Sequence, residues 1–222
     1  MSDIGFAVDE IWYPPANILY HGDKKLRTQI KADVKRQVNE GMSAAVMLVG
    51  MAKMTGYEYR LQPVNQKEQT PDVRTMRIVE TPGEPNWMEV QEVEVVTLEK
   101  NSTEQVDNFL KRTKLSSKKA YPPKMVILCH INKNLRKGKS WRDIHQSLKH
   151  LGIPNQVYIL ARIDPLEHKY QLVEVNPNLG LVEYDVQQEL YSKPRQKILK
   201  MERGATPYLR PNGETHIPFE DL

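Results

Sequence analysis

The sequence has a single cysteine, Cys129, among its 222 residues. One cysteine cannot form an internal disulfide bond or a cysteine-rich zinc site. No apolar run approaches the roughly 20 residues that span a bilayer, and the first residues lack the basic and then apolar layout of a secretory signal. These absences predict an intracellular, cytoplasmic protein with no membrane partner.

Short motifs of several enzyme classes are also missing. The sequence contains no glycine-rich phosphate-binding loop, no Gly-x-Ser-x-Gly turn and no dinucleotide-binding fingerprint. Its six histidines are scattered without the spacing of a metal site, and Cys129 lies in an apolar run where a thiol is inert. Nucleotide-dependent and serine-hydrolase chemistry are therefore not indicated.

The composition is that of a soluble globular protein with a mild positive charge. Hydrophobic residues make up 39% of the chain and charged residues 27%, which excludes both a disordered and a membrane-embedded chain. The 32 basic and 28 acidic residues give a formal charge of +4. This charge permits a nucleic-acid partner without requiring one.

The hydrophobic pattern divides the chain into three parts. Residues 1–25 show no periodic pattern and are expected to form an N-terminal extension. From Leu26, apolar residues recur at three- and four-residue steps, which predicts a helix that ends at Gly56. The alternation of strands and helices in residues 26–186 predicts an α/β domain, and residues 187–222 are expected to be a C-terminal tail. Further elements are expected at 72–79, 87–97, 102–110, 125–131, 140–151, 157–163 and 170–186.

Two segments rich in strand-forming residues flank the turn signal Pro82-Gly83 and are expected to pair as a hairpin. If the turn centres on Gly83, hydrophobic residues face hydrophobic residues. The same register sets Arg74 against Glu92 and Arg77 against Glu89. A slip of one residue would turn one strand over and lose these matches, so the pattern favours this register.

This register leaves one repulsive pair. Asp72 would face Glu94 directly, with Glu92 diagonal to it, and like charges in such positions destabilise a sheet. A hard divalent cation, Mg²⁺ or Mn²⁺, would remove the repulsion because it takes oxygen ligands. The hairpin therefore predicts a metal site at Asp72, Glu92 and Glu94. The plain alternative is a solvent-exposed face on which Arg74 neutralises the acids.

The segment 28–164 resembles the PD-(D/E)XK nuclease superfamily. The resemblance is carried by Pro71-Asp72, by the Glu-x-acid pattern on the next strand, and by the order of helices and strands. It implies a restriction-endonuclease-like αβββαβ core, with a mixed central sheet flanked by helices. It also implies a metal-dependent DNA endonuclease whose catalytic residues are Asp72, Glu92 and Glu94, with Mg²⁺ activating a water molecule against a phosphodiester.

The expected lysine of that motif is missing. In Glu94-Val95-Val96-Thr97, Val96 stands where the family has lysine, and the alternative Glu92-Val93-Glu94 matches a relaxed form of the motif. A third alignment, Glu89-Val90-Gln91, lies on the opposite face of the strand from Asp72 in the expected register.

Other residues are candidates to complete the site. Lys100, Lys111 and Lys114 lie further along the chain and are candidates to replace the missing lysine. Glu40 occupies the first helix, where some family members add an acid, although a lone glutamate there is also typical of a solvated surface.

The densest group of basic residues lies at 133–142, beside Trp141. Such a loop can contact phosphates, and its plain alternative is a solvated charged loop. The residues expected to bind nucleic acid are Lys133, Arg136, Lys137, Lys139 and Arg142.

Three functions remain open from the sequence. The first is the endonuclease, with DNA as partner and a homodimer as one way to cut both strands. The second is a catalytically inactive nuclease-like fold that binds nucleic acid or protein, which the missing lysine favours. The third is an unrelated α/β interaction protein, in which the acids of the hairpin do not converge.

Overall fold

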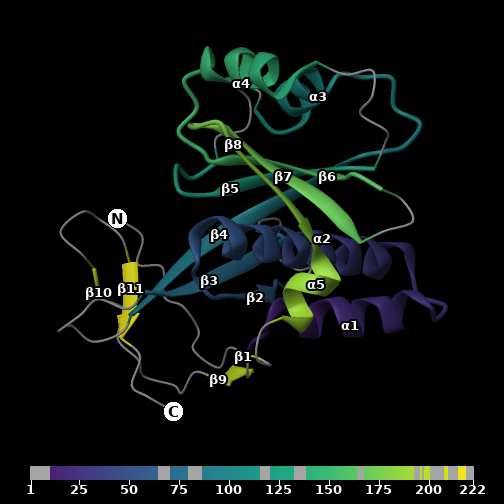
Figure 1. Ribbon diagram of the computed structural model, residues 1–222, viewed down its shortest axis with the longest axis vertical. Coiled ribbons are helices and arrows are strands. Elements are labelled where there is room, and N and C mark those ends of the chain that lie inside the picture. Colours follow the sequence, from purple (N-terminus) through teal and green to yellow (C-terminus); the bar gives the residue numbers. More distant parts are fainter. Residues whose placement is uncertain are drawn as a thin grey trace.

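A β-sheet with helices on both of its faces organises the chain in the computed structural model (Figure 1). The structure describes residues 11–64, 71–79, 87–115, 121–132, 139–164, 168–192, 196, 198–200, 208–209 and 215–218. The helices are α1 (Pro15–Leu26), α2 (Ala32–Thr55), α3 (Val106–Thr113), α4 (Trp141–Lys149) and α5 (Val186–Tyr191). The strands are β1 (Ile11–Trp12), β2 (Tyr59–Pro63), β3 (Val73–Val79), β4 (Trp87–Leu98), β5 (Val126–Ile131), β6 (Val157–Arg162), β7 (Lys169–Asn176), β8 (Gly180–Asp185), β9 (Leu199–Lys200), β10 (Tyr208–Leu209) and β11 (Thr215–Pro218).

Seven strands pair in the order β2-β3-β4-β5-β6-β7-β8. The central strands β4, β5 and β6 run parallel, and α3 and α4 lie in the crossovers that parallel neighbours require. The outer pairs are antiparallel, and β11 and β10 join the sheet at the first residues of β4. A separate pair is formed by β1 and β9. The predicted α/β class with a mixed sheet is therefore confirmed.

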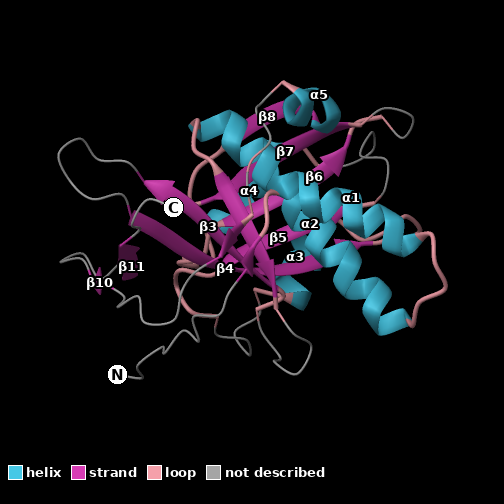
Figure 2. Cartoon of the chain, turned by 90° about the horizontal axis from the view of Figure 1, so that it is seen from below, coloured by secondary structure: helices cyan, strands magenta, loops and turns pink. Residues whose placement is uncertain are grey.

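Two hydrophobic layers hold the helices to the sheet. On one face, α2 packs with α1 and α5, and Figure 2 views the sheet from this side. On the other face, α3 and α4 cover β5, β6 and β7, and Cys129 lies buried in this layer. Because side chains alternate along a strand, Val93 and Val95 of β4 face α2, whereas Leu98 faces α3 and α4.

Helix α2 is the longest of the described helices and carries much of the first layer. Its second half is almost continuously buried, as its run of apolar residues predicted. The helix ends at Gly56, whose φ of 77° is the left-handed conformation that closes a helix, so the predicted end is confirmed. Gly50 lies directly against the ring of Tyr184, whose hydroxyl donates a hydrogen bond to the carbonyl of Val46 at 2.7 Å.

The predicted register of the hairpin is confirmed. Strands β3 and β4 pair from Val79 with Trp87 to Val73 with Val93, and both arginines of β3 face glutamates. The ladder ends there, before the expected pair of Asp72 with Glu94. The amide of Asp72 instead donates to the carbonyl of Val93 at 3.1 Å.

Several elements were not expected from the sequence. Strand β2 pairs with β3, although it is short and ends in a proline. The segment expected as an extension contains α1, which packs on α2, and the predicted helix from Leu26 is divided between α1 and α2. The segment expected as a tail contains most of α5. None of the described helices is long and apolar enough to cross a membrane.

Candidate active site

The end of the hairpin brings Asp72 against β4. Its carboxylate oxygen Oδ2 accepts a hydrogen bond from the amide of Val95 at 2.8 Å, which fixes the side chain beside the strand. Glu94, the preceding residue on β4, is buried with only 6% of its surface exposed. Asp72 and Glu94, which the sequence predicted to lie opposite each other, are thus neighbours at the point where β3 begins.

A lysine from another element reaches these acids. Lys114, the residue that ends α3, forms an ion pair with Glu94, and the two side chains are only 13% and 7% exposed. Burial alone would lower the pKa of Lys114, but the hydrogen bond and the charge of Glu94 outweigh it and raise that pKa. The charge of Asp72 acts in the same direction. Lys114 is therefore held as a cation beside Glu94.

Glu40 of α2 is the third acid. Burial raises its pKa to about 7, and the charges of Asp72 and Glu94 add to the increase, while Arg36 and Lys114 oppose it. Arg36 lies one turn earlier on α2, with its Nε 3.5 Å from Glu40 Oε1. Glu40, Asp72 and Glu94 therefore form one interacting group, which we call the carboxylate cluster.

Tyr121 lies beside the same cluster. Burial raises the pKa of its phenol, and the charges of Glu94 and Asp72 raise it further, whereas Lys114 lowers it by its charge and a hydrogen bond. Tyr121 thus adds a hydrogen-bonding group that touches Lys114. No pattern in the sequence indicated this residue, because it lies just before Pro122-Pro123, in a connection between elements.

Glu92 has a different environment from the one expected. It faces Arg74 in the ladder, and its Oε1 lies 4.0 Å from Arg74 Nε. Of the three predicted metal ligands, Asp72 and Glu94 lie near each other where the hairpin ladder ends, and Glu92 is paired with Arg74.

The predicted basic loop is only partly described. Lys133, Arg136 and Lys137 lie outside the described residues. Lys139 donates to the buried carboxylate of Asp107 at 2.8 Å, which ties it to α3. Arg142 is exposed in the first turn of α4.

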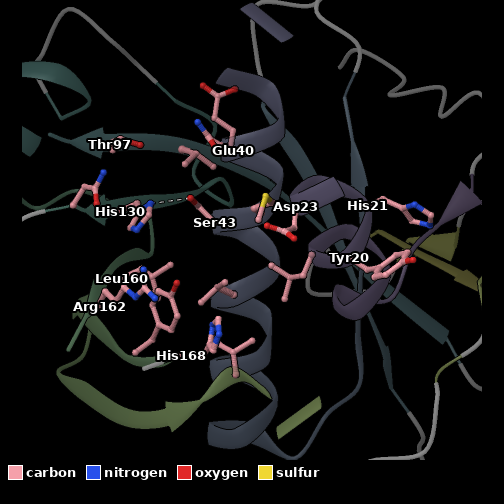
Figure 3. A pocket seen from close by; sticks show the side chains of 18 of the residues that line it. Tyr20, His21, Asp23, Glu40, Ser43, Thr97, His130, Leu160, Arg162 and His168 are labelled. Carbon is pink, nitrogen blue, oxygen red and sulfur yellow. Dashed lines mark hydrogen bonds between the residues drawn. The ribbon is translucent and has the colours of Figure 1, made fainter. Parts of the chain in front are cut away.

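A groove of about 1830 Å³ adjoins the carboxylate cluster at Glu40, Val95 and Val96. Helix α2 runs along the groove, with the ends of β4, β5 and β6 on one side and α1 on the other (Figure 3). Within it, Ser43 and His130 share a hydrogen bond of 2.9 Å that links α2 to β5. Burial lowers the pKa of His130 to about 4, aided by the charge of Arg162, so its imidazole is neutral at pH 7. The sequence did not indicate this groove.

The carboxylate cluster is not arranged as a complete metal-ligand set. In the described part of the chain, no three His, Cys, Asp or Glu side chains are placed to hold an ion together. Asp72 already accepts a backbone hydrogen bond, and Glu94 is paired with Lys114.

Comparison of the chain with protein-family models, with curated proteins and with solved structures gave no match.

Proposed function

We propose that this protein is a metal-dependent nuclease that hydrolyses phosphodiester bonds in DNA. The observation that carries the proposal is the ion pair of Lys114 with Glu94, beside Asp72 and Glu40. It gives the carboxylates the cation that their own strand lacks at Val96. The order of elements from α2 to β5, a helix, three strands, a helix and a strand, also supports the proposal, because PD-(D/E)XK nucleases have this order.

Mg²⁺ or Mn²⁺ would be held by Asp72 and Glu94, with Glu40 as the third carboxylate. Carboxylate oxygens are the ligand atoms that a hard cation prefers. The described side chains are not placed to hold an ion together, so binding would require Glu94 to exchange its contact with Lys114 for the ion. A cation would also relieve the mutual repulsion that contributes to the raised pKa of Glu40. When bound, the ion would polarise the phosphate and lower the pKa of a water molecule.

The other groups of the site have roles that follow from their chemistry. The ammonium of Lys114 would stabilise the negative charge that develops on the phosphate. Tyr121 would hold Lys114 in place through its hydroxyl. Glu40, with its pKa of about 7, is able to take up or release a proton near neutral pH.

A nicking assay on supercoiled plasmid, with Mg²⁺ and with Mn²⁺, tests this proposal. Asp72→Asn keeps an acceptor for the amide of Val95 but removes the charge, and Lys114→Met removes the cation. We expect each to lower the rate by about 100-fold or more. Glu92→Gln and Lys111→Met are the matched controls, because these residues lie on the same elements outside the cluster, and they should retain activity.

Two outcomes would contradict the proposal. One is cleavage that survives both Asp72→Asn and Lys114→Met at the wild-type rate. The other is a wild-type protein that cuts neither plasmid, linear duplex nor single-stranded DNA with either metal. Melting curves of each variant show whether a loss of activity reflects loss of the fold.

A second candidate is a nuclease-like fold that binds nucleic acid without cutting it. The engagement of Asp72 by a backbone amide and of Glu94 by Lys114 favours it, because both acids already have protein partners. It predicts that the wild type binds DNA in the presence of Mg²⁺ without cleavage. Isothermal titration with Mn²⁺ separates the candidates, since the nuclease requires metal binding that Asp72→Asn weakens.

A further inference from the structure

The groove beside the carboxylate cluster opens at the carboxyl ends of parallel strands. Thr97 of β4, His130 of β5 and Arg162 of β6 line it where these three parallel strands end (Figure 3). In α/β proteins, the crevice outside the carboxyl ends of the strands is the usual place for a ligand. The topology therefore marks this groove as a binding site.

The size of the groove points to a polymer. Its volume of about 1830 Å³ exceeds the range of roughly 300 to 1,000 Å³ that is usual for small-molecule sites. The groove also extends along α2 from Glu40 at the cluster to residues near α5. A chain of several units would fill this space better than one small ligand.

The charge along one edge of the groove points to a polyanion. Residues 23–36, which end α1 and begin α2, contain six basic residues and two acidic residues. Three of these cations, Arg27, Lys35 and Arg36, line the groove, and we call them the basic rim. Arg27 forms an ion pair with Asp23 at 2.6 Å and Arg36 one with Glu40 at 3.5 Å. The acids Asp23, Glu40 and Glu99 also line the groove, so a bound phosphate would compete with them for the cations. Arg162 lines the groove on the side of the strands. A phosphate backbone between these two sides would meet cations on both.

Exposed aromatic rings lie on two sides of the same groove. Tyr20 of α1 is 68% exposed and Tyr191 of α5 is 86% exposed, and both line the groove. Tyrosine rings exposed in a cationic groove are typical of proteins that stack unpaired bases. The bases of a duplex are already stacked on each other, so they would not use these rings.

We propose that this groove binds a single-stranded segment of nucleic acid, which leads into the carboxylate cluster at Glu40. Its phosphates would contact the basic rim and Arg162, and its bases would stack on Tyr20 and Tyr191. The direction toward the cluster rests on the proposed nuclease function, whereas the binding itself does not. A nuclease with such a groove would act on substrates with an unpaired strand.

Fluorescence anisotropy of the full chain in EDTA tests the binding without cleavage. The probes are a labelled 20-nucleotide single strand, as DNA and as RNA, and a blunt duplex of the same DNA sequence. We expect the single strand to bind at least tenfold more tightly than the duplex. Tyr20→Ser and Tyr191→Ser should each weaken single-strand binding by about fivefold or more.

Variants that remove a positive charge provide a second test of binding in the same groove. Lys35→Gln and Arg162→Gln should each weaken binding and reduce the slope of log affinity against log salt by about 0.7. Lys149→Gln is the control for charge, because Lys149 is exposed on α4 at the opposite face of the sheet. Tyr57→Ser is the control for an exposed tyrosine that does not line the groove.

Duplex binding as tight as single-strand binding would overturn the proposal, and so would single-strand binding that the groove variants leave unchanged. A preference for DNA or for RNA shows which polynucleotide the groove takes, and either preference supports it. Failure of the nuclease proposal is recognised separately. In that case the single strand still binds in the groove, but no metal yields cleavage.

Discussion

Lys114 at the end of α3 pairs with Glu94 on β4, which lies twenty residues earlier in the sequence, and both side chains are largely buried. The pair is a contact between a strand and a helix. This relationship has consequences for stability that are independent of any activity.

Breaking the pair should be costly, and removing both charges should be less so. Lys114→Met leaves the buried carboxylate of Glu94 without its cation and is expected to lower the free energy of unfolding by roughly 3 kcal/mol. Adding Glu94→Gln to this variant should restore a large part of the loss. Urea unfolding of the two single variants and the double variant measures the coupling. Additive effects of the two changes would show that the pair contributes nothing.

The burial of His130 predicts a loss of stability in mild acid. Its pKa is about 4 in the folded protein, against a usual value near 6.5, so the unfolded chain binds the proton more tightly. The stability is therefore complete above about pH 6.5 and declines as the pH falls toward 4, by about 3 kcal/mol in all. Urea unfolding between pH 7 and 4 measures the decline. His130→Gln should flatten it, and the exposed His150→Gln should not.

The contact of Gly50 with Tyr184 predicts opposite effects for two glycines of α2. A Cβ atom at Gly50 would lie 2.6 Å from the Tyr184 ring. The hydroxyl of Tyr184 is held in place by its hydrogen bond to the carbonyl of Val46. Gly50→Ala is expected to destabilise the protein by roughly 1–3 kcal/mol because the ring cannot easily move. At Gly41 the nearest atom, on Ile18, is 3.8 Å away, so Gly41→Ala should stabilise by up to about 1 kcal/mol. Thermal melting of both variants measures these changes in stability. Equal shifts of the melting temperature in the two variants would contradict the predicted effect of the Gly50 contact.

A buried acid joins α3 to α4. Asp107 is 1% exposed, and its Oδ2 accepts hydrogen bonds from Lys139 at 2.8 Å and from Ser147 at 2.7 Å. Asp107→Asn should lower the free energy of unfolding by roughly 1–3 kcal/mol, because the contact loses its charge and part of its hydrogen bonding. Chemical unfolding measures the change. Lys111→Gln is the control with a smaller expected effect, since its ammonium is 3.9 Å from Asp107 and about a third exposed.

The hairpin was predictable because its pattern is local. Matching hydrophobic residues and opposite charges across one turn leaves a single favourable register, and the structure has that register from Val79 to Val73. Strand β2 was missed because it is short and ends in Pro63, which reads as a break. Helix α1 was missed because its segment carries no regular apolar pattern.

The completion of the candidate site was less predictable, because it depends on where α3 ends. The sequence named Lys100, Lys111 and Lys114 as equal candidates to replace the missing lysine. The structure directs Lys111 to Ser147, at 2.6 Å, and Lys114 to Glu94. Glu40 had a solvated surface as its plain alternative, yet its side chain is only 16% exposed beside the hairpin. Only the packing of α2 and α3 on the sheet separates these possibilities.

The parallel pairing of β4 with β5 also has a consequence for the time at which the site forms. Closing a parallel pair requires the whole intervening crossover, and such distant contacts form slowly. The crossover between these strands carries α3 and therefore Lys114. A chain emerging from the ribosome would hold Asp72 and Glu94 near each other early, through the hairpin. It would acquire the cation only after β5 has been synthesised and paired, so the cluster would be completed as a late event of folding.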